Sequence, residues 1–498
     1  MALPSGPPPS GPALDQAVSF PRRFRDLVAE DPDLPAVTAP DGTRTRAELD
    51  RSSNRTARIW ADLGVTEGSL VTIALGNTTA FVEACMAAWK LGAIPQPVSH
   101  HLPVAELAAI VELADPPLVV GVDPASLPGR QALRGLVPDG AAMRDGDPLP
   151  DRISPSWKAP TSGGSTGRPK LIVSGDAAVW SDLSARFWRV PSDGKAAVVP
   201  GPMYHNGPFM SGLATVLNGG HLVLSERFDA AETLALVEAH QAVWLYLVPT
   251  MMSRIWRLPL EERLAFDIKT LETVWHLAAP CPEWLKRAWI EWVGGDVLVE
   301  LYGGTEGIAT TVITGTEYLD HPGSVGKALI GEIAILGPDG EMLPAGEVGD
   351  VGMRPPARSG PTYRYVGGDA RLIGDWETIG DIGWMDEDGY LFLSDRRSDL
   401  ILVGGANVYP AEVEAVIDEH PLVRSSAVVG LPDEDLGQRV HAIVQGAPGL
   451  TQEDLDAHVR ARLARPKCPR SYEFVEEALR DDAGKVRRSA LRDERMSR

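Results

Sequence analysis

A repeated strand-helix-strand pattern constrains the fold of this chain more than any other feature of its sequence. From about Leu63, a β-branched run precedes an amphipathic helix pattern and a further short apolar run. The helix-then-strand order recurs from Glu106 and again from Phe228. Such units pack in layers around largely parallel sheets. The sequence therefore predicts an α/β fold, and the lack of a fixed-period repeat argues against a solenoid or a propeller.

The pattern changes after about Ser324. Short apolar runs separated by Pro-Asp-Gly and Pro-Ala-Gly turn signals predict a small antiparallel β unit. From Gly389, two expected strands flank a polar, charged segment at residues 394–399, which we interpret as a linker or hinge. Beyond it, helix patterns at about 410–419 and 453–463, strand patterns and a basic tail predict a separate small α+β domain. A chain of 498 residues has room for about three compact units.

The overall charge narrows the classes of partner. A net charge of −21 repels nucleic acids and anionic membrane surfaces, so phosphate recognition must be local. No apolar run approaches the length of a membrane span. Cys85, Cys281 and Cys468 lie too far apart in sequence to indicate a disulfide framework or a zinc site. Residues 1–16 are rich in Pro, Gly and Ser and do not resemble a signal peptide, so we expect a disordered tail and a cytoplasmic protein.

A glycine- and hydroxyl-rich turn at residues 161–170, TSGGSTGRPK, is the first chemical signal. Its glycines let backbone N–H groups converge on an anion, its hydroxyls add donors, and Lys170 supplies a countercharge. It is not a Walker A loop, because Arg168 and Pro169 separate the last glycine from the lysine. By itself, this composition fits a phosphate-binding loop and a flexible surface loop equally well.

The same loop resembles the phosphate loop of the adenylate-forming superfamily, which includes acyl-CoA ligases, peptide-synthetase adenylation domains and luciferases. Four further segments match the family in the same order: LYGGTE at 301–306, Gly-Asp at 380–381, Arg396 in its SDRRSDL context, and Gly-Lys at 484–485. The resemblance covers nearly the whole chain after the tail. It implies a large N-terminal domain of layered α/β subdomains with a small β unit (17–395), a hinge (396–399) and a small mobile C-terminal domain (400–498).

The resemblance implies an ATP-dependent, AMP-forming acid-thiol ligase. Such an enzyme joins a carboxylic acid to coenzyme A through an acyl-adenylate and uses Mg²⁺. Stretches such as PGPMYHNGPFM look most like ligases for bile-acid-like, steroid-like or fatty acids, which favours a bulky apolar acid. Dimers occur among relatives, so a homodimer is possible.

The turn after the apolar strand VLVEL would expose Thr305 and Glu306 at the end of a sheet. A carboxylate there can hold Mg²⁺, and a threonine hydroxyl can donate to a phosphate oxygen. By resemblance, Tyr302 stacks on adenine, while Asp381 and Arg396 bind the ribose. The complete set of expected nucleotide-contacting residues is Thr161, Ser162, Gly163, Gly164, Ser165, Thr166, Gly167, Lys170, Ala279, Pro280, Tyr302, Gly303, Thr305, Glu306, Asp381 and Arg396. Apart from the resemblance, Glu306 could be a solvated turn residue and Asp381 a turn former.

Two expectations concern the C-terminal domain. Lys485 would bridge the acid's carboxylate and the α-phosphate in one pose of the domain. Ser398 aligns with the hinge position, and rotation about it would bring Gly404 and Gly405 to the pantetheine arm of coenzyme A in the second pose. Without the resemblance, the lysine would be read as solvated and the glycine pair as a turn.

The acid itself would meet residues whose roles are less distinctive in sequence. The family places an aromatic residue or His beside the carboxylate, which matches His205. Gly304, Met210, Trp275 and His276 are further candidates for the acid site, although each of the last three could equally belong to the core.

Several positions depart from the family pattern. Gly163-Gly164 replaces a single glycine, and Leu171 follows Lys170 where glycine is usual. Before Lys485, Leu-Arg at 479–480 replaces Leu-Pro, and Asp481 and Asp482 add negative charge that would oppose attack on a nucleotide. Two alternatives therefore stay open: an enzyme of one half-reaction, which either adenylates an acid for a carrier protein or thioesterifies a supplied adenylate, and a catalytically dead nucleotide-binding scaffold.

Overall fold

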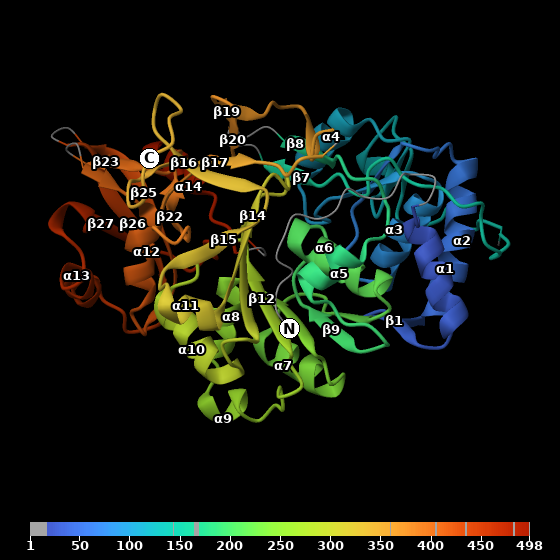
Figure 1. The fold of residues 1–498 in the computed structure, drawn as a ribbon, viewed down its shortest axis with the longest axis horizontal. Coiled ribbons are helices and arrows are strands. Elements are labelled where there is room, and N and C mark those ends of the chain that lie inside the picture. The colour runs from blue at the N-terminus through green and yellow to red at the C-terminus, as the bar shows by residue number, and fades with distance from the viewer. Residues whose placement is uncertain are drawn as a thin grey trace.

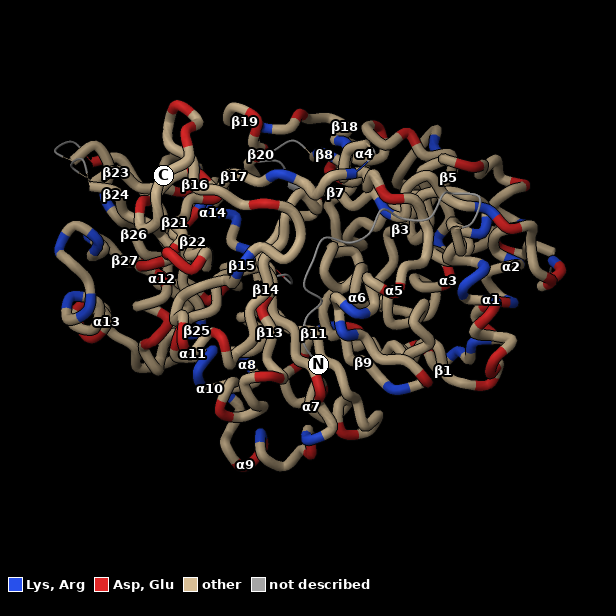
Figure 2. Tube along the Cα trace, viewed as in Figure 1, with Lys and Arg blue, Asp and Glu red and all other residues tan. Residues whose placement is uncertain are grey.

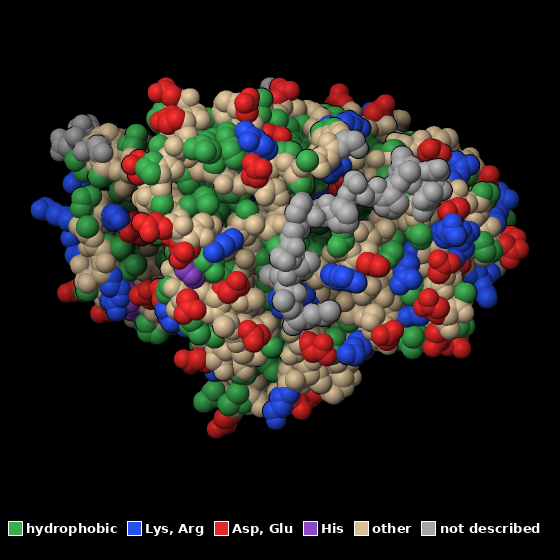
Figure 3. Space-filling view, viewed as in Figure 1, with side chains coloured by type: hydrophobic (Ala, Val, Ile, Leu, Met, Phe, Trp, Pro, Cys, Tyr) green, Lys and Arg blue, Asp and Glu red, His purple; other side chains and the backbone are tan. Residues whose placement is uncertain are grey.

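The computed structural model describes residues 17–142, 144–163, 169–358, 360–403, 406–433, 436–481 and 484–497. In Figure 1 the chain runs from helices at one end of an elongated molecule, through a central sheet, to the C-terminal domain at the other end. No helix in these ranges combines the length and the apolar character needed to cross a bilayer. Acidic and basic residues alternate over the surface elements throughout the chain (Figure 2), and the face drawn in Figure 3 mixes apolar side chains with charges of both signs.

The central sheet contains the predicted parallel strands. β1 (Pro35–Ala39), β10 (His221–Leu224), β9 (Ala196–Val199), β11 (Trp244–Leu247), β12 (Thr273–Leu277) and β13 (Leu298–Gly303) lie side by side in that order and run parallel. β2 (Gly42–Thr45) closes the edge as an antiparallel partner of β1. Strands β9 to β12 are buried at every position, which explains their continuous apolar runs.

A second parallel sheet lies near the N-terminus and confirms the βαβ pattern predicted from Leu63. Its order is β4 (Ile94–Pro97), β3 (Leu70–Ile73), β5 (Leu118–Val120) and β6 (Ala132–Leu133). The helices of this half are α1 (Phe20–Glu30), α2 (Arg46–Asp62), α3 (Thr79–Lys90) and α4 (Val104–Ala114). A capping box fixes the start of α2, because Thr45 and Glu48 satisfy each other's backbone N–H groups.

The helices between the parallel strands of the central sheet complete the layered α/β part. They are α5 (Asp182–Trp188), α6 (Asn206–Leu217), α7 (Ala230–Ala239), α8 (Pro249–Trp256), α9 (Leu260–Arg263), α10 (Glu283–Val293) and α11 (Gly315–Asp320). One apolar core runs continuously from α1 and α3 to the strands β9 to β13. The two α/β layers are therefore packed as one body.

The antiparallel unit forms as expected after about Ser324. It contains β14 (Thr310–Thr314), β15 (Ser324–Ile330), β16 (Glu332–Leu336), β17 (Gly349–Arg354), β19 (Arg371–Ile373), β20 (Trp376–Thr378), β21 (Asp381–Met385) and β22 (Leu391–Arg396). A separate small sheet joins β7 (Thr161–Gly163), β8 (Pro169–Ser174) and β18 (Tyr363–Val366). The strand before the expected hinge is three residues longer than predicted, because β22 continues through residues 394–396 by pairing with β21.

The last part of the chain folds around its own core, as predicted. Its sheet contains β23 (Ile401–Val403), β24 (Ala406–Val408), β25 (Val423–Asp433), β26 (Gly437–Gly446) and β27 (Ser471–Phe474). The accompanying helices are α12 (Pro410–Asp418), α13 (Gln452–Arg460) and α14 (Arg488–Met496). The α/β fold class, with a large N-terminal and a smaller C-terminal domain, is confirmed.

Candidate active site

The candidate site forms at the end of β13. In the same sheet, β14, β15, β22 and β21 follow β13 in that order. Tyr302 lies near the end of β13, and its hydroxyl donates a 2.7 Å hydrogen bond to Asp381 Oδ2 at the start of β21. Arg396 pairs with Asp381 across the strands, and its Nε lies 3.4 Å from Asp381 Oδ1. The structure therefore brings together three residues that were predicted separately.

Electrostatics at this triad favour a ligand with hydroxyl groups. Burial raises the pKa of Asp381, and this rise is opposed by Arg396 and by the hydrogen bond from Tyr302. Burial and the neighbouring Asp381 in turn raise the pKa of Tyr302, so its hydroxyl stays a donor. Arg396 is 61% exposed, whereas the carboxylate beside it is almost buried. Asp381 can thus offer acceptor oxygens to hydroxyl groups at the edge of the cleft.

Glu306 lies in the turn after β13 and is also buried. Tyr365, on β18, donates a 2.6 Å hydrogen bond to Glu306 Oε1, and the Lys170 ammonium stands 3.7 Å from the centre of the Tyr365 ring. A Cβ added at Gly304 would come within 2.6 Å of Glu306 Oε2, so a larger residue there would displace the carboxylate. The carboxylate is therefore held in place by its surroundings.

Lys485 reaches the same cleft from the C-terminal domain. Gly484 has a φ of +75°, and a Cβ there would lie 2.9 Å from Thr250 Oγ1 on α8. Lys485 is exposed, but the protein around its ammonium removes part of its hydration and so lowers its pKa. Arg396 lowers this pKa further, whereas Asp481 and Glu306 raise it. The Lys485 loop is therefore docked against the N-terminal domain, within the electrostatic field of Glu306 and Arg396.

The docking rests on contacts that the sequence pattern did not reveal. Arg257, at the end of α8, donates to the carbonyl oxygens of Val423 and Asp418 in the C-terminal domain. The Arg480 guanidinium donates to the carbonyl oxygens of Gly484, at 3.2 Å, and Ser426, at 3.1 Å. These bonds hold the chain segment that carries Lys485.

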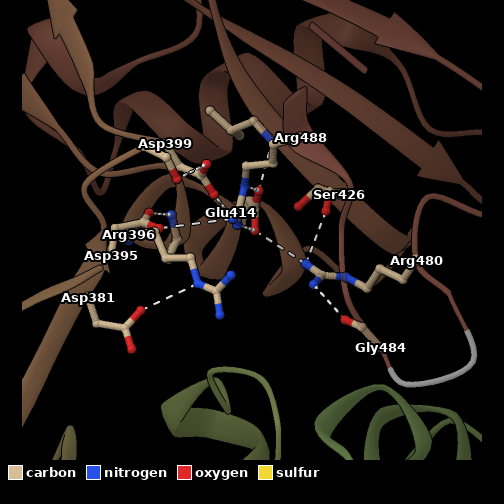
Figure 4. Close-up of polar contacts among 12 residues, drawn as sticks. Asp381, Asp395, Arg396, Asp399, Glu414, Ser426, Arg480, Gly484 and Arg488 are labelled. Atoms are coloured by element: carbon tan, nitrogen blue, oxygen red, sulfur yellow. Dashed lines mark hydrogen bonds and ion pairs between the residues drawn. The ribbon is translucent and has the colours of Figure 1, made fainter. Parts of the chain in front are cut away.

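A buried carboxylate links this segment to the predicted hinge (Figure 4). Glu414, on α12, accepts from Arg480 at 3.3 Å and from Arg488 at 2.8 and 3.0 Å. Arg488 also donates to Asp399 Oδ2 at 2.8 Å. From the sequence, Arg480 was only a departure from the family pattern. The structure shows that it joins Glu414 to the segment that carries Lys485.

The remaining predicted residues have mixed outcomes. Residues 164–167, 404 and 405 lie outside the described residues, as does the side chain of Ser162, and Gly163 is the last residue of β7. Thr161 follows directly after a buried segment, and its Oγ1 is buried with no partner among the described residues. Gly303 ends β13, Thr305 lies in the turn beside Glu306, and Ala279 and Pro280 follow the end of β12. Ser398 is exposed in the turn after β22.

The predicted acid-binding residues separate into two groups. His205 directly precedes α6, and Met210 is half-buried one turn into that helix. Trp275 and His276, by contrast, have no exposed surface. The Trp275 indole packs on Phe187 and donates to the carbonyl oxygen of Trp188. These two residues pack in the core of the sheet, which is the alternative that the sequence left open, and their place in the acid site stays a prediction.

Comparison with protein families decides the relationship. The model of the AMP-binding enzyme family matches residues 24–359, and the model of the AMP-binding enzyme C-terminal domain matches residues 412–485. The chain belongs to the AMP-binding enzyme family. The resemblance inferred from the motifs is thereby confirmed.

Individual relatives match this family member over nearly its whole length. It is 31% identical to a fatty acid–acyl-carrier-protein ligase of Streptomyces coeruleorubidus, with 93% of this chain and 94% of the relative covered. It is 30% identical to a feruloyl-CoA synthase of Amycolatopsis, with 93% and 96% covered. Among solved structures, the o-succinylbenzoate CoA synthetase of Bacillus subtilis, in complex with its acyl-adenylate, superposes with a TM-score of 0.80 at 24% identity, covering 96% of this chain and 98% of that one.

A second solved relative is an amide bond synthetase of Marinactinospora thermotolerans. It is 27% identical, has a TM-score of 0.76, and covers 96% of this chain and 99% of its own. The names of these relatives thus give different acceptors for the acid: a carrier protein, coenzyme A or an amine.

The described residues of this AMP-binding enzyme fit a polyphosphate nucleotide with a divalent cation. Lys170, Lys485 and Arg396 place cationic groups around the cleft, and Thr161 offers an unsatisfied hydroxyl. The carboxylate of Glu306 is a hard oxygen ligand of the kind that Mg²⁺ prefers. The donor set is therefore suited to nucleotide phosphates, although the role of each residue remains a prediction.

Proposed function

We propose that this protein is an acyl-CoA ligase that activates a bulky apolar carboxylic acid as an acyl-adenylate and transfers the acyl group to the thiol of coenzyme A. Family membership supports the reaction class, and the electrostatic influence of Glu306 and Arg396 on both Lys485 and Asp381 carries the proposal for this chain. The relatives named as CoA ligases or synthases, which match over both domains, do not favour an enzyme of a single half-reaction.

In the first half-reaction, an oxygen of the acid's carboxylate attacks the α-phosphorus of ATP, and pyrophosphate leaves. The Lys485 ammonium would hold the carboxylate against the α-phosphate and offset the charge that develops there. Asp381, kept in place by Tyr302 and Arg396, would accept hydrogen bonds from the ribose. When bound at Glu306, Mg²⁺ supplies further neutralisation of phosphate charge.

In the second half-reaction, the thiolate of coenzyme A attacks the adenylate's carbonyl carbon, and AMP leaves. The loop that carries Lys485 packs against α8 of the N-terminal domain, and we infer that the C-terminal domain rotates away from this position to admit the thiol. We infer that the turn at Ser398 absorbs this rotation, because it is exposed and lies between β22 of one domain and β23 of the other.

Acid-dependent exchange of pyrophosphate into ATP, followed by detection of the CoA thioester, tests the proposal. A complete ligase gives both signals. Thioester formed only from a supplied acyl-adenylate would indicate an enzyme of one half-reaction, and inertness in both assays would indicate a scaffold. We also propose that the protein forms a homodimer, which light scattering of the purified protein tests.

A further inference from the structure

Lys158 is a buried cation to which the mechanism above gives no role. It lies three positions before β7 and is only 5% exposed. Its Nζ donates to Asn206 Oδ1, lies 3.3 Å from Met210 Sδ, and stands 4.9 Å from the centre of the Trp157 ring. Within the described part of the chain, no carboxylate forms an ion pair with it. A buried ammonium without an anionic partner is costly, so its presence requires an explanation.

The hydrogen bonds of this ammonium are incomplete. A lysine has three donors, and a thioether sulfur is a weak acceptor. Asn206 is thus the one strong acceptor for Lys158 among the described residues. Because Asn206 directs its Oδ1 toward the ammonium, its Nδ2 donor points elsewhere. The pair therefore presents unused donors rather than acceptors.

The surroundings also disfavour a positive charge. Lys158 contacts the first residue of α6, where the helix dipole is positive and no side chain caps the helix. Burial lowers its pKa to about 7, and the attraction of Asp176 and Glu306 offsets only part of this effect. A hydrogen-bond acceptor bound beside Lys158 would supply the missing hydrogen bonds. It would also offset the unfavourable interaction of the ammonium with the α6 dipole.

The position of Lys158 indicates where such a group would come from. Asn206 and Met210 are half-buried, and Asn206 directly follows His205, the residue predicted to lie beside the acid. The Lys158 ammonium lies against Met210, one of the residues predicted to contact the acid, whereas Lys485 is carried by the C-terminal domain.

We propose that Lys158 and Asn206 bind an oxygen acceptor carried by the acid at a distance from its reacting carboxyl group. The inference rests on the proposed function and specifies its substrate class: a bulky, largely apolar acid with one further carboxylate, keto or hydroxyl oxygen. The apolar body packs against the Met210 side, and the Lys158 ammonium and the Asn206 amide donate to the oxygen. A purely hydrocarbon acid would leave both donors unsatisfied.

Matched pairs of acids test the proposal with the full-length protein. Each pair shares one apolar body, such as a phenylalkanoic or a fused-ring alkanoic acid, with and without a terminal carboxylate or keto group. In pyrophosphate exchange, the wild type should use the oxygen-bearing member of at least one pair with a kcat/KM about 10 to 100 times higher. The carboxylate and keto arms separate an anionic acceptor from a neutral one.

Two variants assign that preference to this position. Lys158→Met removes the charge but keeps the length of the side chain, so it should fold, and the ratio of kcat/KM within the preferred pair should fall about tenfold or more. Asn206→Asp gives Lys158 a permanent carboxylate partner, so the ratio should fall most for the anionic acid. An unchanged ratio in Lys158→Met, or a wild type that never distinguishes the members of a pair, overturns the proposal.

A binding measurement keeps this inference separate from the proposed function. The shift in melting temperature caused by each acid should show the same preference, and Lys158→Met should lose it. If no acid supports exchange but the preferred acid still stabilises the wild type selectively, the proposed reaction fails while the binding site stands. If exchange occurs but both members of every pair stabilise the protein equally, the proposed reaction stands and the proposed binding site fails.

Discussion

The Tyr302 hydroxyl donates to Asp381 Oδ2 across 2.7 Å and so joins the end of β13 to the start of β21. We expect Asp381→Asn to raise the KM for ATP about 10- to 100-fold in pyrophosphate exchange, because a carboxylate acceptor for the ribose is lost. Tyr302→Phe keeps the aromatic ring and should raise it by less than about tenfold.

Repeating the measurement with 2′-deoxy-ATP shows whether the contact is to the ribose. If Asp381 binds the 2′-hydroxyl, loss of that hydroxyl should cost the wild type far more than it costs Asp381→Asn. Penalties that simply add would mean that Asp381 supports the fold and does not touch the sugar.

Arg480 should matter for adenylation more than for thioester formation. Its bonds to the Gly484 and Ser426 carbonyl oxygens hold the Lys485 loop. We expect Arg480→Met to slow pyrophosphate exchange about 10- to 100-fold, because misplacement of a catalytic group by about 1 Å is this costly. Thioester formation from a supplied acyl-adenylate should change little. Arg492→Met is the matched control, since Arg492 contacts only its neighbour Asp493 among the described residues; equal losses in the two variants would contradict this role.

Ala278 has a φ of +77°, a conformation that costs a non-glycine residue about 1 to 2 kcal/mol. It is exposed, so removing its methyl group leaves no cavity. Ala278→Gly should therefore raise the free energy of unfolding by about 0.5 kcal/mol, after subtraction of the glycine's greater freedom in the unfolded chain. Ala279→Gly, at a neighbour without positive φ, should lower it. Denaturant titration measures both, and destabilisation of similar size in the two variants would show that Ala278 is not strained.

Asp395 makes stability depend on pH in a direction opposite to that of a salt-bridged carboxylate. Burial raises its pKa from the ordinary 3.8 to about 6, although Arg488 and the N–H of Ala411 oppose the rise. Between about pH 4 and 6 the folded protein therefore binds more protons at Asp395 than the unfolded chain does, and this contribution falls as pH rises.

Asp395→Asn removes that contribution. The difference in unfolding free energy between the variant and the wild type should grow by about 2 kcal/mol in the variant's favour from pH 4 to pH 6. Asp388→Asn, at an exposed turn, should show a flat difference. Urea titrations at intervals of half a pH unit check this, and a difference that shrinks with rising pH would reverse the assigned cause.

Local sequence patterns predicted much of the fold because strand burial and turn formation depend on residues that are close in sequence. The continuous apolar runs of β9 to β12 follow from strands buried on both faces, and the turn signals after Ser324 follow from antiparallel hairpins. The motif residues Tyr302, Asp381 and Arg396 were found from the sequence as well. Their mutual contacts were not, because those depend on the order of strands in the sheet.

What the sequence did not reveal depends on contacts between distant segments. Lys158 and Asn206 are 48 positions apart, and Tyr365 and Glu306 are 59 apart, so no local spacing marks either pair. The sequence allowed Trp275 a place in the acid pocket or in the core, and only the structure shows that Phe187 and Trp188 pack against its ring. A lysine in an apolar stretch such as SPSWKAP gives no sign of burial before the fold is known.

The two half-reactions of Lys485→Ala test the central claim most directly. If Lys485 acts only while the C-terminal domain is docked, as we propose, its loss should reduce pyrophosphate exchange about 10²- to 10³-fold, the usual cost of removing a preorganised donor. Thioester formation from a supplied acyl-adenylate should stay within about threefold of the wild type, because that step follows departure of the lysine from the cleft. Equal losses in both reactions would contradict the account of one nucleotide cleft served by two poses of the C-terminal domain.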